Sequence, residues 1–190
     1  MIRFKQAAVA LAAAALATAA QAQSSGADSR IGWYGDLALG GSHYESEPGF
    51  ITCRCRKASA TAFKIGAGYR FGVAAVEAWY WNLGKASFDA DSYGPATSAH
   101  FRAALLGAAF AARWGQHVEA TWRVGAAFVD ASAAGGATKH DVRPAAGFSI
   151  GWRTTETATL ELGLDYVRAT DASGARTDAM PITLGLRQRF

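Results

Sequence analysis

Apolar residues alternate with small or polar ones along most of this chain, with a period of two. The clearest run is at the carboxyl end, where Ile182, Leu184, Leu186 and Phe190 share one parity. Because successive side chains of a strand point to opposite faces of its sheet, this alternation predicts strands with one apolar face. The predicted strands are 31–41, 60–71, 73–85, 99–112, 118–129, 142–152, 158–167 and 180–190.

The predicted strands are long enough to cross a membrane, although two of them alternate less regularly. A tilted spanning strand needs about 9 to 11 residues, and each segment has that length or slightly more. In the third and fourth segments, Trp79, Trp81 and Phe110 fall on the parity that is otherwise small or polar. A helix is an alternative for the alanine-rich segment 99–112, because alanine favours helices. The pattern of the whole chain favours a strand there.

The connections between the predicted strands alternate in length. The short ones are Gly72, 113–117 and 153–157, and the long polar ones are 42–59, 86–98, 130–141 and 168–179. An even number of strands joined by short periplasmic turns and long external loops is the pattern of outer-membrane barrels. The sequence therefore predicts an all-β fold, an eight-stranded antiparallel up-and-down transmembrane β-barrel with both mature termini in the periplasm.

Aromatic residues test this topology independently, because amphipathic rings favour the two membrane interfaces. Five rings fall at the strand ends near the short turns: Trp33, Phe71, Trp114, Trp152 and Phe190. Tyr80, Phe128 and Tyr166 fall towards the opposite ends. Strand parity, loop length and ring position thus indicate the same barrel.

The first 22 residues have the features of a cleaved secretion signal. Arg3 and Lys5 provide a positive start, an apolar stretch follows, and Ala20-Gln21-Ala22 is a small-residue cleavage site. The apolar stretch is too short to span a bilayer, although a retained anchor is the alternative. We expect 1–22 to be removed and 23–190 to form one barrel domain in the bacterial outer membrane.

Composition excludes several other classes of protein. The 19 basic residues fall to 17 without Arg3 and Lys5, against 15 acidic ones, so the small net charge does not indicate a nucleic-acid partner. Two cysteines are too few for a small domain held together by disulfides. No mature stretch has about 18 consecutive apolar residues, so no transmembrane helix is expected after the signal.

Three segments resemble the OmpA-type family of membrane barrels, which includes the OmpA transmembrane domain and small stand-alone barrels. They are IGWYGDLALGG at 31–41, KIGAGYRFGVAAVEAWYWNLGK at 64–85 and TLGLRQRF at 183–190. The resemblance implies buried lumen charges at Lys64 and Glu77. It also implies insertion by the barrel-assembly machinery, with an assembly signal at Leu184, Leu186 and Phe190.

This sequence departs from the family pattern in two respects. It ends at Phe190 without a domain of the kind that grips peptidoglycan, so a tethering function is not expected. Gln188 stands where family members more often carry tyrosine or another apolar residue, which weakens the assembly signal but leaves the terminal ring.

Charged residues collect on the parity that the barrel is expected to turn inward. They are Asp36, Lys64, Arg70, Glu77, Arg102, Glu119, Arg123, Arg143, Glu161, Asp165, Arg187 and Arg189. An eight-stranded barrel is just wide enough for side chains to fill, and enclosed charges must be paired. A salt-bridged plug is one interpretation and a gated conduction pathway is the other. Glu161 and Arg187 are predicted to form a cross-strand ion pair.

The four histidines do not indicate an enzyme. His43, His100 and His140 fall near long loops and His117 in a short turn, and none forms an evident catalytic motif with a serine. A hydrolase needs a nucleophile, a base and an orienting group that converge. We expect neither catalysis nor a cofactor, with a lipid-modifying enzyme as the alternative.

Cys53 and Cys55 lie two residues apart in the first long loop. Exposed cysteines of an exported protein are expected to be oxidised, so a disulfide between Cys53 and Cys55 is predicted, although a bond across one intervening residue is sterically tight. Pairing between molecules is one alternative. Metal binding is another, with His43 as the plausible third ligand.

The same loop carries Arg54, Arg56 and Lys57. These charges could bind lipopolysaccharide phosphates or an acidic host surface, or could simply keep the loop solvated. The predicted function is an envelope-structural or surface-interaction role of the outer loops, with outer-membrane lipid, lipopolysaccharide and an unknown surface ligand as partners. A narrow pore for small solutes is the alternative.

Overall fold

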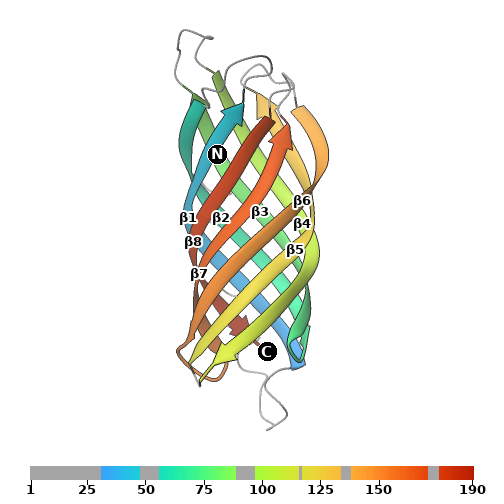
Figure 1. Ribbon diagram of the computed structural model, residues 1–190, viewed down its shortest axis with the longest axis vertical. Helices are drawn as coiled ribbons and strands as arrows, with labels where there is room; N and C mark the ends of the chain where they lie inside the picture. The colour runs from blue at the N-terminus through green and yellow to red at the C-terminus, as the bar shows by residue number, and fades with distance from the viewer. Residues whose placement is uncertain (1–30, 48–55, 89–96, 116, 134–137, 171–175) are drawn as a thin grey trace, which may run out of the picture.

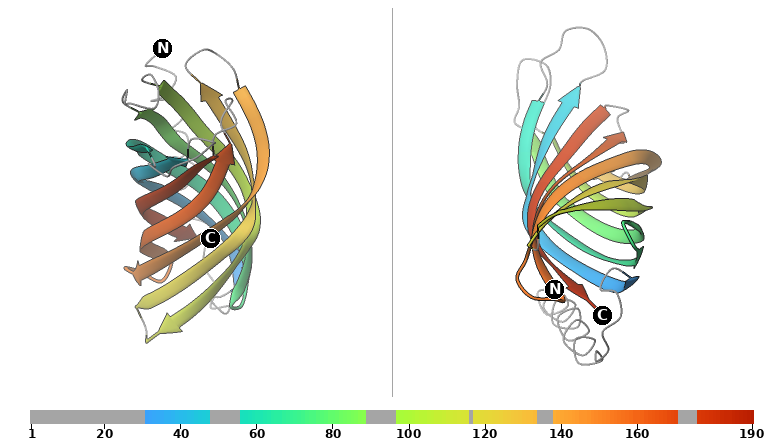
Figure 2. Two further views of the ribbon diagram at one scale, coloured as in Figure 1. Left: turned by 45° about the horizontal axis from the view of Figure 1, so that its top comes forward. Right: turned by 60° about the horizontal axis from the view of Figure 1, so that its bottom comes forward.

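Eight antiparallel strands form a closed barrel in which each strand pairs with its neighbours in sequence and β1 pairs with β8 (Figure 1). The computed structural model describes residues 31–47, 56–88, 97–115, 117–133, 138–170 and 176–190. The strands are β1 Ile31–Glu47, β2 Arg56–Phe71, β3 Ala74–Phe88, β4 Thr97–Trp114, β5 Val118–Ala133, β6 Thr138–Arg153, β7 Ala158–Thr170 and β8 Arg176–Arg189. They wind obliquely around the barrel axis, as closure of an eight-stranded sheet requires (Figure 2). The predicted fold class is therefore confirmed.

The two ends of the barrel differ in their connections. At one end, which we call the turn end, β2 joins β3 through Gly72 and β4 joins β5 through Gly115. Both glycines have positive φ, 81° and 64°, a conformation that glycine adopts without steric cost. We call the opposite end, where segments such as 48–55 lie outside the described residues, the loop end. β1 begins and β8 ends at the turn end, at the bottom of Figure 1.

The strands extend further towards the loop end than the sequence pattern predicts. Ser42 to Ser46 of β1 pair with Arg56 to Ala60 of β2, although the sequence analysis assigns these residues to a long loop, with the single exception of Ala60. Pairing continues because backbone hydrogen bonds do not require the apolar alternation that ends near Gly41. The helical alternative for 99–112 is wrong, since β4 covers all of it.

One irregularity in β3 changes which residues face inward. The pairing of β3 with β4 shifts between Asn82 and Gly84, and Gly84 has a φ of 89°. Leu83 and Ala86 are both buried, so the inward parity changes from odd to even across this bulge. Bulges of this kind bend a strand and re-aim its side chains.

The outer wall carries an apolar belt with aromatic borders. Leu106, Val124, Leu162 and Leu184 are exposed in its middle. Towards the turn end the exposed rings are Trp33, Phe71, Trp114 and Trp152, and towards the loop end they are Tyr80, Phe128 and Tyr166. No helix in the described part of the chain is long and apolar enough to cross a membrane.

Candidate functional site

The interior of the barrel has two halves of opposite character. Near the turn end it holds buried ionisable residues, namely Asp36, Lys64, Arg70, Glu77, Glu119, Arg123, Glu161, Asp165 and Arg187. We call this set the charge network. Towards the loop end the interior is apolar, with buried Tyr44, Trp81, Leu83, Phe101, Val129 and Val167. A narrow barrel is filled by such side chains and is not an open tube.

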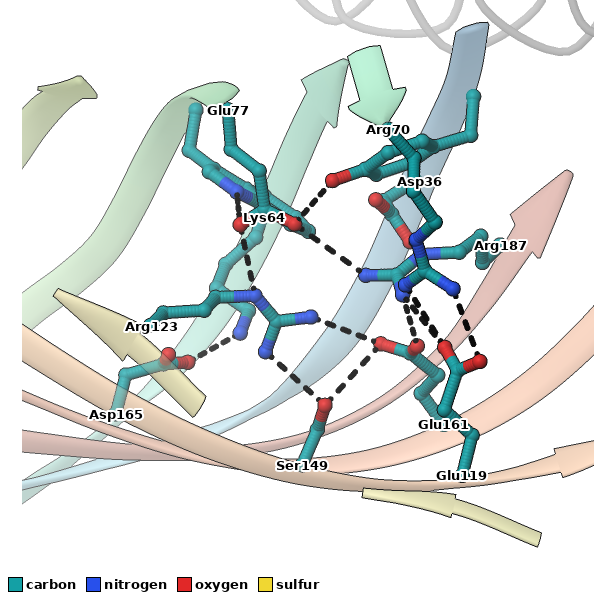
Figure 3. A network of polar contacts seen from close by, with 12 residues as sticks. Asp36, Lys64, Arg70, Glu77, Glu119, Arg123, Ser149, Glu161, Asp165 and Arg187 are labelled. Carbon is teal, nitrogen blue, oxygen red and sulfur yellow. Dashed lines mark hydrogen bonds and ion pairs between the residues drawn. The ribbon is translucent and has the colours of Figure 1, made fainter. Parts of the chain in front are cut away.

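Arg187 of β8 is the centre of the charge network and has 0% of its surface exposed. Its Nε donates to Asp36 Oδ1 at 3.0 Å, and its Nη1 lies 2.9 Å from Glu161 Oε1. Its Nη2 lies 3.6 Å from Glu77 Oε1, and its Nη1 also lies 3.6 Å from Glu119 Oε1. Arg187 is thus surrounded by four carboxylates, as Figure 3 shows.

Arg123 of β5 connects carboxylates across the lumen. Its Nε donates to Glu77 Oε2 at 3.0 Å and its Nη2 to Glu161 Oε2 at 3.1 Å. Its Nη1 donates to Ser149 Oγ at 3.1 Å (Figure 3). Because β3, β5 and β7 are not adjacent, these bonds brace the barrel through its interior, in addition to the backbone ladders of its wall.

Aromatic side chains and Lys64 complete the network. Glu77 accepts hydrogen bonds from Tyr34 Oη at 2.5 Å and from Trp79 Nε1 at 3.0 Å. Lys64 of β2 forms an ion pair with Asp165 of β7, and its Nζ lies 5.4 Å from the ring centre of Trp79. Hydrogen bonding and cation–π contact of this kind compensate the desolvation of buried charges.

Side chains fill the lumen almost completely at the level of the charge network. Asp36, Lys64, Arg123 and Glu161 line a cavity of about 10 Å³ there. That volume is close to what a single water molecule needs. The geometry at this level therefore leaves no room for a continuous column of water.

The apolar half closes the interior further. Tyr44 of β1 stacks on Phe101 of β4 with ring centres 5.2 Å apart, and its hydroxyl donates to the Leu83 carbonyl at 2.5 Å. Trp81 is only 1% exposed beside them. This apolar half is not among the features predicted from the sequence, although Trp79 and Trp81 on the lumen parity are its signal.

The structure corrects the placement of two residues in β4. Arg102 is exposed on the outer wall, not in the lumen, and Phe110 also points outward with 50% exposure. The inward residues of β4 are Ala99, Phe101, Ala103, Leu105 and Ala109. Alanines occupy both faces of this strand, so its alternation does not reveal which parity is inside.

The remaining predicted charges lie at the two rims. Arg143 is half-exposed at the loop end, where its Nε donates to Asp141 at 2.8 Å and its Nη2 to Thr170 at 2.9 Å. Arg189 lies at the turn end, 3.3 Å from Glu119. Glu161 and Arg187 lie together, as the sequence analysis expects.

The histidines have partners of several kinds. His140 Nδ1 lies 2.6 Å from Asp130, and His43 lies 3.8 Å from Glu45. His117 stacks on Trp152 at the turn end. Among the described residues, no group of three His, Cys, Asp or Glu side chains is placed to hold a metal ion.

Several expectations concern residues that the structure does not describe. The secretion signal 1–22 and the pair Cys53 and Cys55 lie outside the described residues, as does Arg54. Arg56 and Lys57 belong to β2 and not to a loop. The disulfide and its alternatives therefore stay predictions.

Gly68 is expected to be necessary for the bond between Tyr34 and Glu77. A Cβ on Gly68 would lie 2.5 Å from the Tyr34 hydroxyl and 2.9 Å from the Val76 carbonyl. We expect Gly68→Ala to lower the free energy of unfolding in lipid vesicles by about 1 to 3 kcal/mol, a typical cost of overpacking. Gly41→Ala is the control, because its Cβ would come no nearer than 3.7 Å to Ala60. Equal stability of the two variants would contradict tight packing around Tyr34.

Comparison with known proteins places this geometry among membrane barrels. A family model described as an outer membrane protein beta-barrel domain matches residues 8–190, beginning within the predicted secretion signal. The chain is similar to the solved structure of Neisserial surface protein A, with 16% identity, a TM-score of 0.61 and coverage of 87% of this chain and 100% of that one.

A second similar structure is the outer membrane protein OprG from Pseudomonas aeruginosa, with 11% identity and a TM-score of 0.56. The alignment covers 85% of this chain and 98% of that one. At such identities the likeness concerns the fold. A comparison with curated proteins finds no match.

Proposed function

Because the chain belongs to the outer membrane protein beta-barrel domain family, we propose that it is a closed barrel with an envelope-structural or surface-interaction role. Membership confirms the OmpA-type resemblance and the outer-membrane location. The interior of the barrel and its two ends support the specific role.

The filled interior is the observation that carries this proposal. The charge network and the apolar half occupy successive levels of one lumen, and the cavity within the network measures about 10 Å³. Bonds such as Arg123 to Glu77 and Arg123 to Glu161 hold opposite walls at fixed distances. A rigid barrel of this kind suits a scaffold that presents its loops to partners, because binding residues are commonly placed on loops held by a rigid framework.

The orientation is part of the proposal. We place the turn end in the periplasm and the loop end outside the cell, with residues 1–22 removed on export. Both ends of the described chain lie at the turn end, and tight turns join the strands there. In outer-membrane barrels the short turns are periplasmic. Outer-membrane lipid, lipopolysaccharide and a surface ligand are the proposed partners on the loop side, and the assembly machinery on the turn side.

We propose no catalytic role. The partners of His140 and His43 are the carboxylates of Asp130 and Glu45, and not a serine hydroxyl that a histidine base could activate. If the protein modified lipid, the mass spectrum of lipid A from producing cells would differ from that of cells without the gene. We expect identical spectra.

The purified mature barrel is expected to show no stable ion conductance in a planar bilayer. Side chains occupy the lumen at the level of Arg187 and again at Trp81, so ions have no continuous water path. A boiled sample and a buffer blank control for leakage. Reproducible single-channel steps that are absent from the boiled sample would support the narrow pore instead.

A further inference from the structure

Four arginines meet at the mouth of the lumen at the turn end. They are Arg70 of β2, Arg113 of β4, Arg153 of β6 and Arg189 of β8. Every second strand thus contributes one arginine, and each lies next in sequence to an aromatic residue. We call these four residues the arginine ring.

Three members of the arginine ring contact one carboxylate, that of Glu119. Arg70 binds Glu119 with a two-pronged contact of 2.9 and 2.8 Å, visible in Figure 3. Arg113 Nε donates to the same carboxylate at 3.0 Å and Arg189 Nη2 at 3.3 Å. Arg189 is in turn repelled electrostatically by Arg70, Arg113 and Arg153. Arg70 and Arg113 thus place two positive charges against the one carboxylate of Glu119.

Some donors of the arginine ring are also unused. Arg113 Nη2 and Arg70 Nε are buried and have no hydrogen-bond partner among the described residues. A buried donor without a partner is unfavourable, and a hydrogen bond from a charged donor is among the strongest that proteins make. An anionic acceptor within hydrogen-bond distance of these groups would satisfy them.

A cavity lies beside both arginines. It measures about 290 Å³ and is lined by Arg70, Arg113 and Glu119 together with Gly72, Val73 and Ala111. Small-molecule sites usually measure about 300 to 1,000 Å³, so this one suits a small group. The planar donor fork of arginine matches the oxygens of phosphate and carboxylate groups.

We propose that the arginine ring binds a small oxyanion, the phosphate or carboxylate group of a soluble solute on the turn side of the membrane. A lipid headgroup is the less suitable source. The four arginines share the inward parity of their strands, whereas lipid surrounds outward aromatic residues such as Trp114 and Trp152. The site is separate from any role of the loops and does not require conduction.

The test measures binding of inorganic phosphate to the folded mature barrel in a zwitterionic detergent by titration calorimetry. Chloride at equal ionic strength and pH is the reference, and acetate reports on carboxylates. We expect saturable phosphate binding that Arg113→Gln weakens about ten-fold or more, the loss of one charge-assisted contact. Arg102→Gln is the matched control, because it removes an exposed arginine at the other end of the barrel.

A second variant keeps all four arginines. Ala111→Glu should place a tethered carboxylate at the cavity and abolish phosphate binding in a barrel that still migrates as folded on an unheated gel. It replaces Arg113→Gln if that variant does not fold. Equal phosphate affinity in wild type, Arg113→Gln and Ala111→Glu would overturn the proposal.

A stability measurement in lipid tests whether the anion belongs to a soluble solute or to a lipid headgroup. The free energy of unfolding is compared in bilayer discs of phosphatidylglycerol and of phosphatidylcholine, both without free phosphate. We expect the anionic phosphatidylglycerol to give no stabilisation that Arg113→Gln removes. Such stabilisation would assign the ring to a lipid headgroup and overturn the soluble solute.

Discussion

Replacing Arg187 by methionine is expected to lower the free energy of unfolding by about 3 to 5 kcal/mol, the usual effect of removing one partner from a buried ion pair. The guanidinium of Arg187 is fully enclosed and lies within 3.6 Å of the carboxylates of Asp36, Glu77, Glu119 and Glu161. Methionine fills similar volume but leaves these carboxylates without their shared counter-charge. Urea unfolding in lipid vesicles measures the change.

Arg102→Met is the matched control for this prediction, because Arg102 is an exposed arginine of the same barrel. It should change stability by no more than about 0.5 kcal/mol, as surface substitutions usually do. A loss in Arg187→Met no larger than that of the control would show that the charges of the network do not stabilise the fold.

A double-mutant cycle tests whether Glu161 and Arg187 interact in the folded barrel. Glu161→Gln should cost less than Arg187→Met, about 1 to 3 kcal/mol, because Arg187 keeps Asp36 and Glu77 beside it. The double variant should recover part of the summed loss, since neither charge is then left alone. Strict additivity would mean that Glu161 and Arg187 do not interact in the folded barrel.

The strands could be predicted from the sequence wherever one face is apolar and the other is not. In β7, Leu160, Leu162 and Leu164 are exposed to the outside while Glu161 and Asp165 are buried, as the alternation indicates. The strand ends at the loop side could not be predicted, because beyond the apolar belt the outer face of the wall is no longer apolar and the regular alternation ends, although pairing continues.

The inward face of β4 could not be predicted, for a different reason. Its two faces are both rich in alanine, and the interior it borders at the loop end is apolar, so Leu105 is inside while Leu106 is outside. The rule that polar residues face the lumen holds only beside the charge network. Arg102 and Phe110 are expected in the lumen only if that rule holds for the whole barrel, and both lie on the outer wall.

The partners within the charge network depend on the barrel as a whole. Glu161 and Arg187 could be paired from the sequence because β7 and β8 are adjacent. The bond from Arg123 to Glu77 joins β5 to β3. It depends on the closure of the barrel, on the stagger of its strands and on the space that glycines leave, such as Gly66 beside Trp79. Alternation along single strands carries none of this information.

Leu184→Arg and Thr183→Arg are expected to destabilise the barrel for different reasons. Leu184 is 56% exposed in the apolar belt, whereas its neighbour Thr183 is 2% exposed and faces the interior. An arginine at 184 would lie in hydrocarbon, at a cost of about 2 to 4 kcal/mol near the middle of the bilayer. An arginine at 183 would enter a filled lumen, where Thr183 and Lys64 both lie within 3.6 Å of a Cβ on Gly163.

The dependence on the membrane separates these two causes. We expect the loss in Leu184→Arg to grow in vesicles of a thicker lipid, because the charge then lies deeper in hydrocarbon and reaches the headgroups less easily. The loss in Thr183→Arg arises from crowding and repulsion inside the barrel, so it should be nearly the same in both lipids. Leu184→Ile controls for the change of side chain on the outer wall. If Leu184→Arg is as stable as that control in both lipids, Leu184 does not face lipid and the register of β8 against β1 and β7 is wrong.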